Sequence, residues 1–72
     1  MTELKQIFSD NLKFYREKRA LSQAGLARRT GTKQNSICRF EKGVNEPSFL
    51  LIERLSIALE IEPTELFKKR FS

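Results

Sequence analysis

Apolar residues recur every three or four positions along the whole chain, and no stretch sustains the apolar/polar alternation of a half-buried strand. The first segment shows the pattern clearly, because Leu4, Phe8 and Leu12 follow one another at intervals of four. Such spacing places the three side chains on one face of an amphipathic helix. The chain is therefore expected to fold as a compact all-α domain.

Capping and turn residues divide this pattern into five short helices. Serine and threonine side chains accept hydrogen bonds from the first turn of a helix, and they precede the second, third and fourth helices at Ser22, Thr32 and Ser48. Glycine at positive φ is a common helix end, so Gly31 and Gly43 are expected to end the second and third helices. The predicted helices cover residues 4–18, 23–30, 33–42, 49–60 and 63–69.

The length of 72 residues indicates one domain, spanning residues 1–72, with no linker. A chain this short buries only about 60% of the surface that its unfolded form exposes, so its stability is marginal without self-association. The longest apolar run, Phe49–Ile52, is too short for a membrane span, and the charges at Glu3 and Lys5 argue against a secretory signal. A cytoplasmic protein with no membrane partner is expected.

The residue inventory leaves little room for catalysis or cofactor chemistry. The chain has no histidine and a single cysteine, Cys38, which excludes an internal disulfide, thiolate/imidazole zinc sites and histidine-based triads. Carboxylate or lysine catalysis is compatible with the composition, but a chain of this size has little room for a deep pocket. No cofactor, no metal site and no enzymatic activity are expected.

The charge of +5 is unevenly distributed along the chain. Residues 1–43 carry ten Lys/Arg against four Asp/Glu, whereas residues 44–67 carry one Arg against five Glu. This asymmetry predicts a polyanion-binding surface in the first half of the chain, with the acidic segment turned away from it. A solvated surface of mixed charge explains the same counts equally well.

The segment Gln23–Lys42 has the features of two helices joined by a tight turn. Ala27 is small enough to allow a close helix crossing, and Gly31 permits the turn. The apolar residues expected to anchor the pair to the core are Leu26, Ile37 and Phe40. An ordinary helix pair in a bundle would explain all of these residues, but it would not explain the polar, amide-rich start of the third helix.

Over most of its length the chain resembles the phage-repressor/Cro-type helix-turn-helix family, whose members have a lambda-repressor-like fold. The likeness runs from about Phe8 to Phe67, and the matching motifs occur in one order and at one spacing. They are Leu21–Gln23, Leu26-Ala27, Ile37–Gly43, Pro47–Phe49 and Ala58–Phe67. The chain departs from the family at Ala20 and Glu60, where glycine is common.

The resemblance implies a sequence-specific regulator that binds double-stranded DNA, with the third helix (33–42) in the major groove and the second across the backbone. The residues implied to read bases are Lys33, Gln34, Asn35 and Arg39. Those implied to contact phosphates are Gln23, Ser36, Lys42 and Asn45, with Arg19 and Arg28 as further possibilities. The alternative for each of these side chains is a solvated helix or loop residue.

The resemblance also assigns a structural role to two charged residues. Arg16 and Glu41 match the positions of a partly buried ion pair that joins the first helix to the end of the third. Arg16 is therefore expected to belong to the scaffold and not to the base-reading surface.

Members of this family usually bind a two-fold operator as homodimers, and this chain has apolar residues to spare for such an interface. The candidate dimer residues are Leu50, Ile57, Ile61, Phe67 and Phe71. For Ile61 and Phe67, a place in the hydrophobic core is equally compatible with the sequence.

The resemblance fits a phage or prophage Cro-like repressor or a restriction-modification controller, with no small-molecule ligand. The alternative function is a protein-interaction module, such as an antitoxin or adaptor, that uses the same fold without reading bases.

Overall fold

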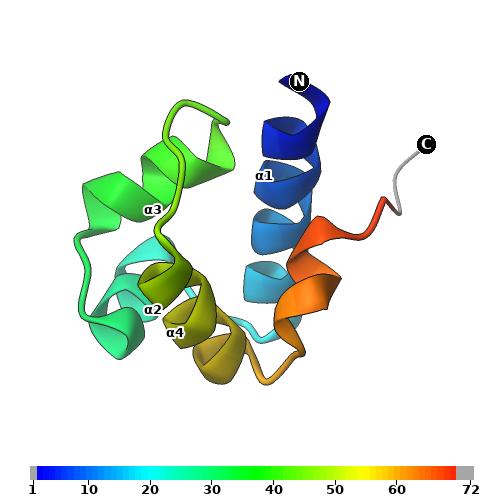
Figure 1. Cartoon of the computed structure of the whole chain (residues 1–72). Helices are drawn as coiled ribbons and strands as arrows, with labels where there is room; N and C mark the ends of the chain where they lie inside the picture. The colour runs from blue at the N-terminus through cyan, green and yellow to red at the C-terminus, as the bar shows by residue number, and fades with distance from the viewer. Residues whose placement is uncertain (1, 70–72) are drawn as a thin grey trace.

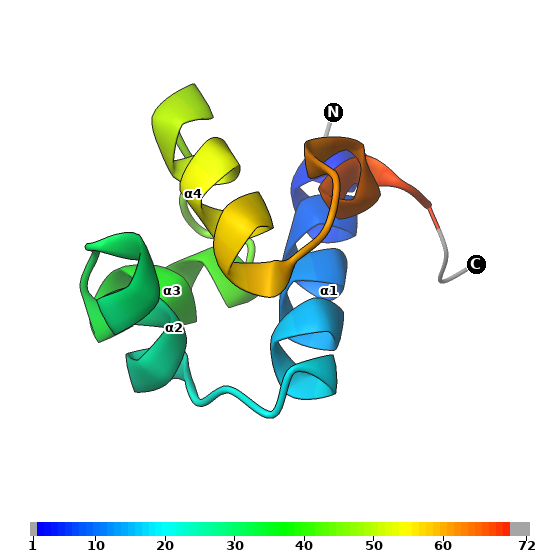
Figure 2. The same ribbon diagram turned by 90° about the horizontal axis from the view of Figure 1, so that it is seen from below.

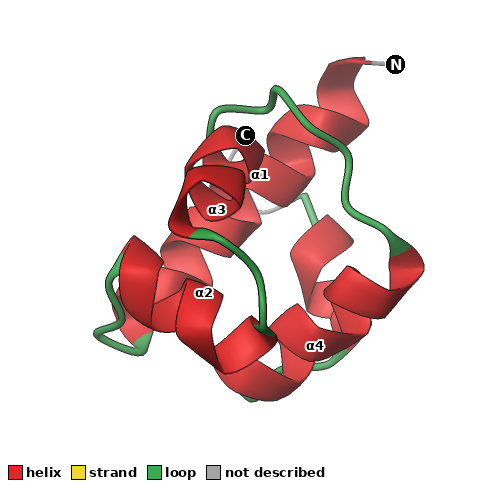
Figure 3. Ribbon diagram, turned by 90° about the vertical axis from the view of Figure 1, so that its left-hand side faces the viewer, coloured by secondary structure: helices red, strands yellow, loops and turns green. Residues whose placement is uncertain are grey.

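The computed structural model describes residues 2–69, and these residues form only helices and loops, with no strand among them (Figure 3). The elements are α1 (Thr2–Lys18), α2 (Gln23–Thr30), α3 (Gln34–Glu41), α4 (Phe49–Leu59) and the 3-10 helix η1 (Pro63–Phe67), shown in Figure 1. The all-α prediction is confirmed. The last element differs from the prediction, since it is a short 3-10 helix that ends at Phe67. Within residues 2–69, no helix is both long and apolar enough to cross a membrane.

Two of the three predicted helix caps are present. The Oγ atoms of Ser22 and Ser48 accept hydrogen bonds from the backbone N–H groups of Gly25 (2.9 Å) and Leu51 (3.1 Å). The prediction for Thr32 is wrong, because the N-cap of α3 is the next residue, Lys33, whose backbone is extended (φ −98°, ψ 148°). Lys33 makes no side-chain capping hydrogen bond, so α3 begins without one.

The core lies where α1, α2, α3 and α4 converge, with η1 covering one side of α1 (Figure 2). Leu12, Leu26, Ile37, Leu55, Leu59 and Leu66 are fully buried there. Phe67 lies at the edge of this core and stacks on Phe8, with ring centroids 5.7 Å apart. Leu4 does not follow the apolar face that its spacing predicts, since it is 56% exposed near the start of α1.

Side chains of α1 hold η1 in place. The Asn11 side-chain amide donates to the carbonyl oxygens of Leu66 (3.1 Å) and Lys68 (2.7 Å), and the Tyr15 hydroxyl donates to Glu65 Oε1 (2.8 Å). A five-residue helix has too few internal hydrogen bonds to be stable alone. The packing of η1 on α1 therefore depends on these long-range contacts together with the burial of Leu66.

In the described part of the chain, two non-glycine residues adopt the left-handed conformation near helix ends: Ala20 (φ +56°) and Glu60 (φ +59°). In the family that this chain resembles, glycine is common at both positions. The Arg19 guanidinium supports the second of these turns, since Nε donates to the Leu59 carbonyl oxygen at 2.8 Å. Arg19 therefore belongs to the scaffold that closes α4.

Replacing Glu60 by glycine is expected to raise the free energy of unfolding by about 0.5–1 kcal/mol, because relief of the Cβ clash outweighs the added flexibility of the unfolded chain. The melting temperature should rise by about 2–8 °C for a domain of this size. Glu62→Gly is the matched control, since Glu62 has an ordinary extended backbone (φ −70°) and should lose stability. Thermal and urea unfolding followed by circular dichroism would measure both variants. A Glu60→Gly protein no more stable than the parent would contradict the expectation.

Candidate nucleic-acid interface

The turn between α2 and α3 sets the angle at which the two helices meet. Gly31 takes the left-handed conformation (φ +69°) as the C-cap of α2, and the N–H of Thr32 donates to the Ala27 carbonyl oxygen at 3.0 Å. Leu26, Ala27 and Ile37 are buried at the junction. α3 is thereby held firmly against α2 and the core by one face, and its opposite face is exposed.

The exposed face of α3 carries three of the four predicted base readers. Gln34, Asn35 and Arg39 are all exposed, and Asn35 and Arg39 lie one helical turn apart on the same side. Lys33, the fourth, is exposed just before the helix begins. The amide and guanidinium groups of these residues match the hydrogen-bonding edges of adenine and guanine.

The predicted phosphate contacts are more dispersed. Lys42 is exposed at the C-cap of α3, whereas Ser36 is half-buried beside the base readers. Asn45 lies farther along the loop and lines an apolar groove, of about 370 Å³, between α1 and the start of α4. Gln23 is the first residue of α2, and its side chain is held by Glu41, as described below.

The segment that contains α2 and the start of α3 is rich in positive charge. Residues 18–40 contain six Lys/Arg and no Asp/Glu. The nearest acidic residue after them, Glu41, has a buried carboxylate that is paired with Arg16. A surface of one sign raises the local concentration of a polyanion and speeds its association.

Arg16 and Glu41 join α1 to the end of α3. Nε and Nη2 of Arg16 donate to the two carboxylate oxygens of Glu41 at 2.6 and 3.1 Å, and the side chains are 12% and 5% exposed. The hydrogen bond to Glu41 raises the pKa of the Arg16 guanidinium, which therefore stays charged wherever the protein is folded. Arg16 Nη1 also donates to the Leu21 carbonyl oxygen at 2.8 Å, which fixes the loop before α2.

The sequence prediction missed that Gln23 and Arg19 bond to the scaffold. Gln23 Nε2 donates to Glu41 Oε1 at 3.0 Å, across 18 positions of sequence, and Arg19 reaches carbonyl oxygens 40 and 41 positions away. No local pattern indicates either contact, because each depends on how separate helices pack.

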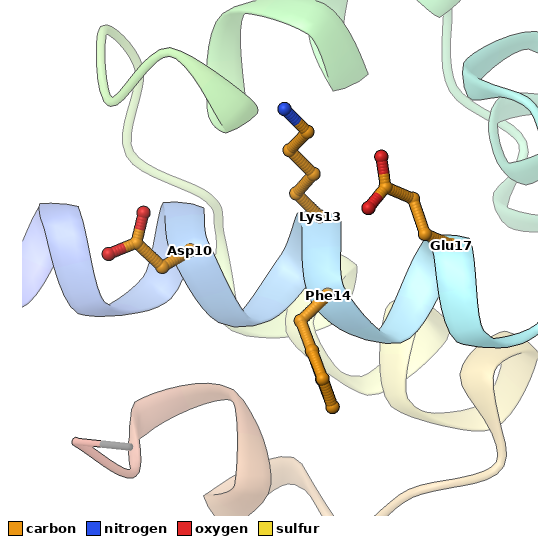
Figure 4. Close-up of a pocket in the computed structure, with 4 residues that line it drawn as sticks. All are labelled: Asp10, Lys13, Phe14 and Glu17. Atoms are coloured by element: carbon orange, nitrogen blue, oxygen red, sulfur yellow. The ribbon is translucent and has the colours of Figure 1, made fainter. Parts of the chain in front are cut away.

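Metal-binding clusters are not found among residues 2–69. No group of three or more His, Cys, Asp or Glu residues is placed to hold a metal ion there. A shallow hollow of about 360 Å³ is lined by Asp10, Lys13, Phe14 and Glu17. All four residues belong to α1, where their spacing places them on one face, and Figure 4 shows the side chains of Lys13 and Glu17 projecting toward one edge of that face and Phe14 toward the other.

The candidate dimer residues fall into two groups. Leu50 and Ile57 are 55% and 76% exposed on α4, whereas Ile61 and Phe67 are half-buried against the core. Phe71 lies outside the described residues. Phe49, which was not among the predicted residues, is 89% exposed beside the apolar groove.

In this domain a tight turn joins two short helices, and the second helix exposes amide and basic side chains. This arrangement defines a helix-turn-helix domain. Residues 12–66 match the family model HTH_3, described as helix-turn-helix. The chain belongs to this family, of the Cro/C1 type, and a DNA-binding regulator is the class of protein that fold and family indicate.

Three solved structures are similar to this chain. The restriction-modification controller protein C.AhdI from Aeromonas hydrophila is 35% identical (TM-score 0.84), with 88% of this chain and 96% of that chain covered. The hypothetical transcription factor NHTF from Neisseria is 23% identical (TM-score 0.86; 90% and 75% covered). An HTH_3 family transcriptional regulator from Vibrio cholerae is 24% identical (TM-score 0.84; 92% and 37% covered). The last two support the fold alone. No curated protein gives a significant match.

Proposed function

We propose that this protein is a sequence-specific regulator of transcription that inserts α3 into the major groove of double-stranded DNA. The observation that carries the proposal is the exposed face of α3, where Gln34, Asn35 and Arg39 stand on a helix fixed against α2. A rigid support matters because base readout requires side chains held in register with the base edges.

Each side chain on this face has a role suited to its chemistry. Arg39 would donate two hydrogen bonds to guanine O6 and N7, and Gln34 or Asn35 would bind adenine N6 and N7. Lys33, at the start of α3, would reach a neighbouring base. Contacts to phosphates are proposed for Gln23, Ser36, Lys42 and Asn45, which would set the register of the protein on the duplex.

Among regulators of this family, the restriction-modification controller type is the one we favour over a phage or prophage repressor. C.AhdI, a restriction-modification controller protein, is similar to this chain over 88% of the chain at 35% identity. A controller would act through its own concentration, with no small-molecule ligand.

The protein is proposed to bind its operator as a symmetric homodimer through α4. Leu50 and Ile57 lie seven residues apart on the outer side of this helix, with the exposed charges Glu53 and Arg54 between them. A two-fold axis crossing α4 between Glu53 and Arg54 would pair the helices antiparallel. Leu50 would then face Ile57 of the second copy, and Glu53 would face Arg54. This charge complementarity, together with two exposed apolar side chains, favours a second copy as the occupant of this face.

The experiment that tests base readout starts with selection of bound duplexes from random DNA. The selected operator should bind about 10³-fold more tightly than random duplex, and the logarithm of the affinity should fall by about 0.9 per phosphate contact for each tenfold rise in salt. Arg39→Ala should weaken operator binding by about 10–100-fold and relax the preference at one base pair.

Lys68→Ala is the matched control for the loss of one positive charge. Lys68 follows η1, which lies on the opposite side of α1 from α2 and α3 in Figure 1. Its removal should change neither affinity nor preference appreciably. Equal affinity for selected and random duplexes, or an equal loss for both with Arg39→Ala, would contradict base readout by α3.

A further inference from the structure

We propose that Glu41 is a positioning residue for DNA binding, because it holds the side-chain amide of Gln23 in the orientation that contacts a phosphate. The inference rests on the proposed function, in which Gln23 binds the DNA backbone. It adds that the ion pair between α1 and α3 also prepares the phosphate-binding end of α2.

The carboxylate of Glu41, on α3, accepts hydrogen bonds from two other helices. Oε1 accepts hydrogen bonds from Gln23 Nε2 of α2 (3.0 Å) and Arg16 Nη2 of α1 (3.1 Å), and Oε2 accepts from Arg16 Nε (2.6 Å). The backbone of Glu41 is also held, since the Ser9 hydroxyl donates to its carbonyl oxygen at 2.8 Å. With its side chain only 5% exposed, Glu41 offers the Gln23 amide a well-defined acceptor.

This acceptor decides how the Gln23 amide is turned. A carboxylate only accepts hydrogen bonds, so it must face the NH₂ end of the amide and not the oxygen end. One N–H is then donated to Glu41, and the planar geometry of the group directs the other N–H away from it. Gln23 is the first residue of α2, where the helix dipole also favours an anion.

Such positioning strengthens binding because a glutamine side chain otherwise loses considerable rotamer freedom when it is ordered by a ligand. A side chain that is already ordered avoids part of this cost on binding. The negative charge of Glu41 does not repel the phosphate strongly, because it is neutralised by the bidentate contact with Arg16.

The test is a double-mutant cycle that measures operator affinity. Gln23→Met removes the amide and nearly preserves the length of the side chain. Arg16→Met/Glu41→Leu removes the ion pair and replaces both charges by apolar groups, which buried pairs often tolerate. Gln23→Met is expected to weaken binding about tenfold in the parent protein and only about two- to threefold in the double variant. An equal loss in both backgrounds, or no loss in either, would overturn the inference.

The failure of the inference is distinguishable from that of the proposed function. Retention of operator preference over random duplex in the parent protein, with equal losses in the two backgrounds, removes only the role of Glu41. Loss of that preference in the parent removes the proposed function itself.

A second measurement needs no ion-pair variant. In the nuclear magnetic resonance spectrum of the free parent protein, one side-chain N–H of Gln23 should exchange with water more slowly than its geminal partner. The exposed Gln34 amide is the internal reference. On addition of operator, the other Gln23 N–H should shift most. Two Gln23 protons that exchange as fast as those of Gln34 would overturn the inference.

Discussion

Replacing Arg16 by methionine is expected to lower the free energy of unfolding by about 3–5 kcal/mol, because the Glu41 carboxylate is then left buried without its cation. The Glu41 side chain is 5% exposed, and its bond to Arg16 Nε is 2.6 Å long. For a domain of this size, each kcal/mol corresponds to about 4–8 °C in melting temperature. The variant should therefore unfold far below the parent in a urea or thermal titration followed by circular dichroism.

Two controls show whether burial is the cause. Lys69→Met breaks an ion pair of nearly the same length, 2.7 Å to Glu3, but its side chains are 59% and 64% exposed. Its loss should change the stability far less than the loss of Arg16, because water and salt screen an exposed pair. Arg16→Met/Glu41→Leu should recover most of the lost stability, because no charge remains buried alone. Similar costs for the Arg16 and Lys69 substitutions would contradict the burial argument.

Ile57→Lys is expected to dissociate the proposed dimer into monomers and to weaken operator binding by about 100-fold or more. The antiparallel pairing of α4 would bury Ile57, which is 76% exposed in one chain, against Leu50 of a second copy. A lysine there would be desolvated, and a monomer loses the gain from binding two half-sites together. Sedimentation velocity and operator titration measure the two effects. Leu4→Lys is the control, since Leu4 is 56% exposed on α1, outside the α4 face.

Charge reversal tests the proposed register of this interface. Glu53→Arg would place positive charges opposite one another across the two-fold axis and weaken the dimer, whereas Glu53→Arg/Arg54→Glu would restore opposite charges and recover it. A parent protein that sediments as a monomer at high micromolar concentration, with and without operator, would contradict the dimer. A dimer that survives Ile57→Lys would place the interface elsewhere.

The local parts of this fold were predictable because their causes are local. Ser22 and Ser48 cap α2 and α4 through N–H groups only three residues away, and Gly31 takes the positive φ that its lack of a side chain permits. The prediction at Thr32 was wrong by one residue, because Lys33 is the extended residue that precedes α3. Cap position depends on where the packed helix can start, and side-chain chemistry alone does not decide that.

Some features of the candidate site were likewise predictable from local sequence, whereas others depend on the tertiary structure. The amide and guanidinium groups of α3 lie on an exposed face that follows from helical spacing, once Ile37 and Phe40 are directed inward. Local spacing does not indicate the contact of Arg19, because its guanidinium donates to the carbonyl oxygen of Leu59, forty positions along the chain, at the end of α4. Similarly, only the tertiary structure shows that Phe67 packs against Phe8.

The amino-acid sequence by itself determined the all-α class, the positions of the helices to within a few residues, the positive character of residues 18–40 and the polar face of α3. These properties depend on spacing, capping and charge among residues close together in the chain. Only the tertiary structure decided that Gln23 is bound to Glu41, that Arg19 is held by α4, and that Leu50 and Ile57 remain exposed. Each of these depends on which helices meet, and that is set by the shared core.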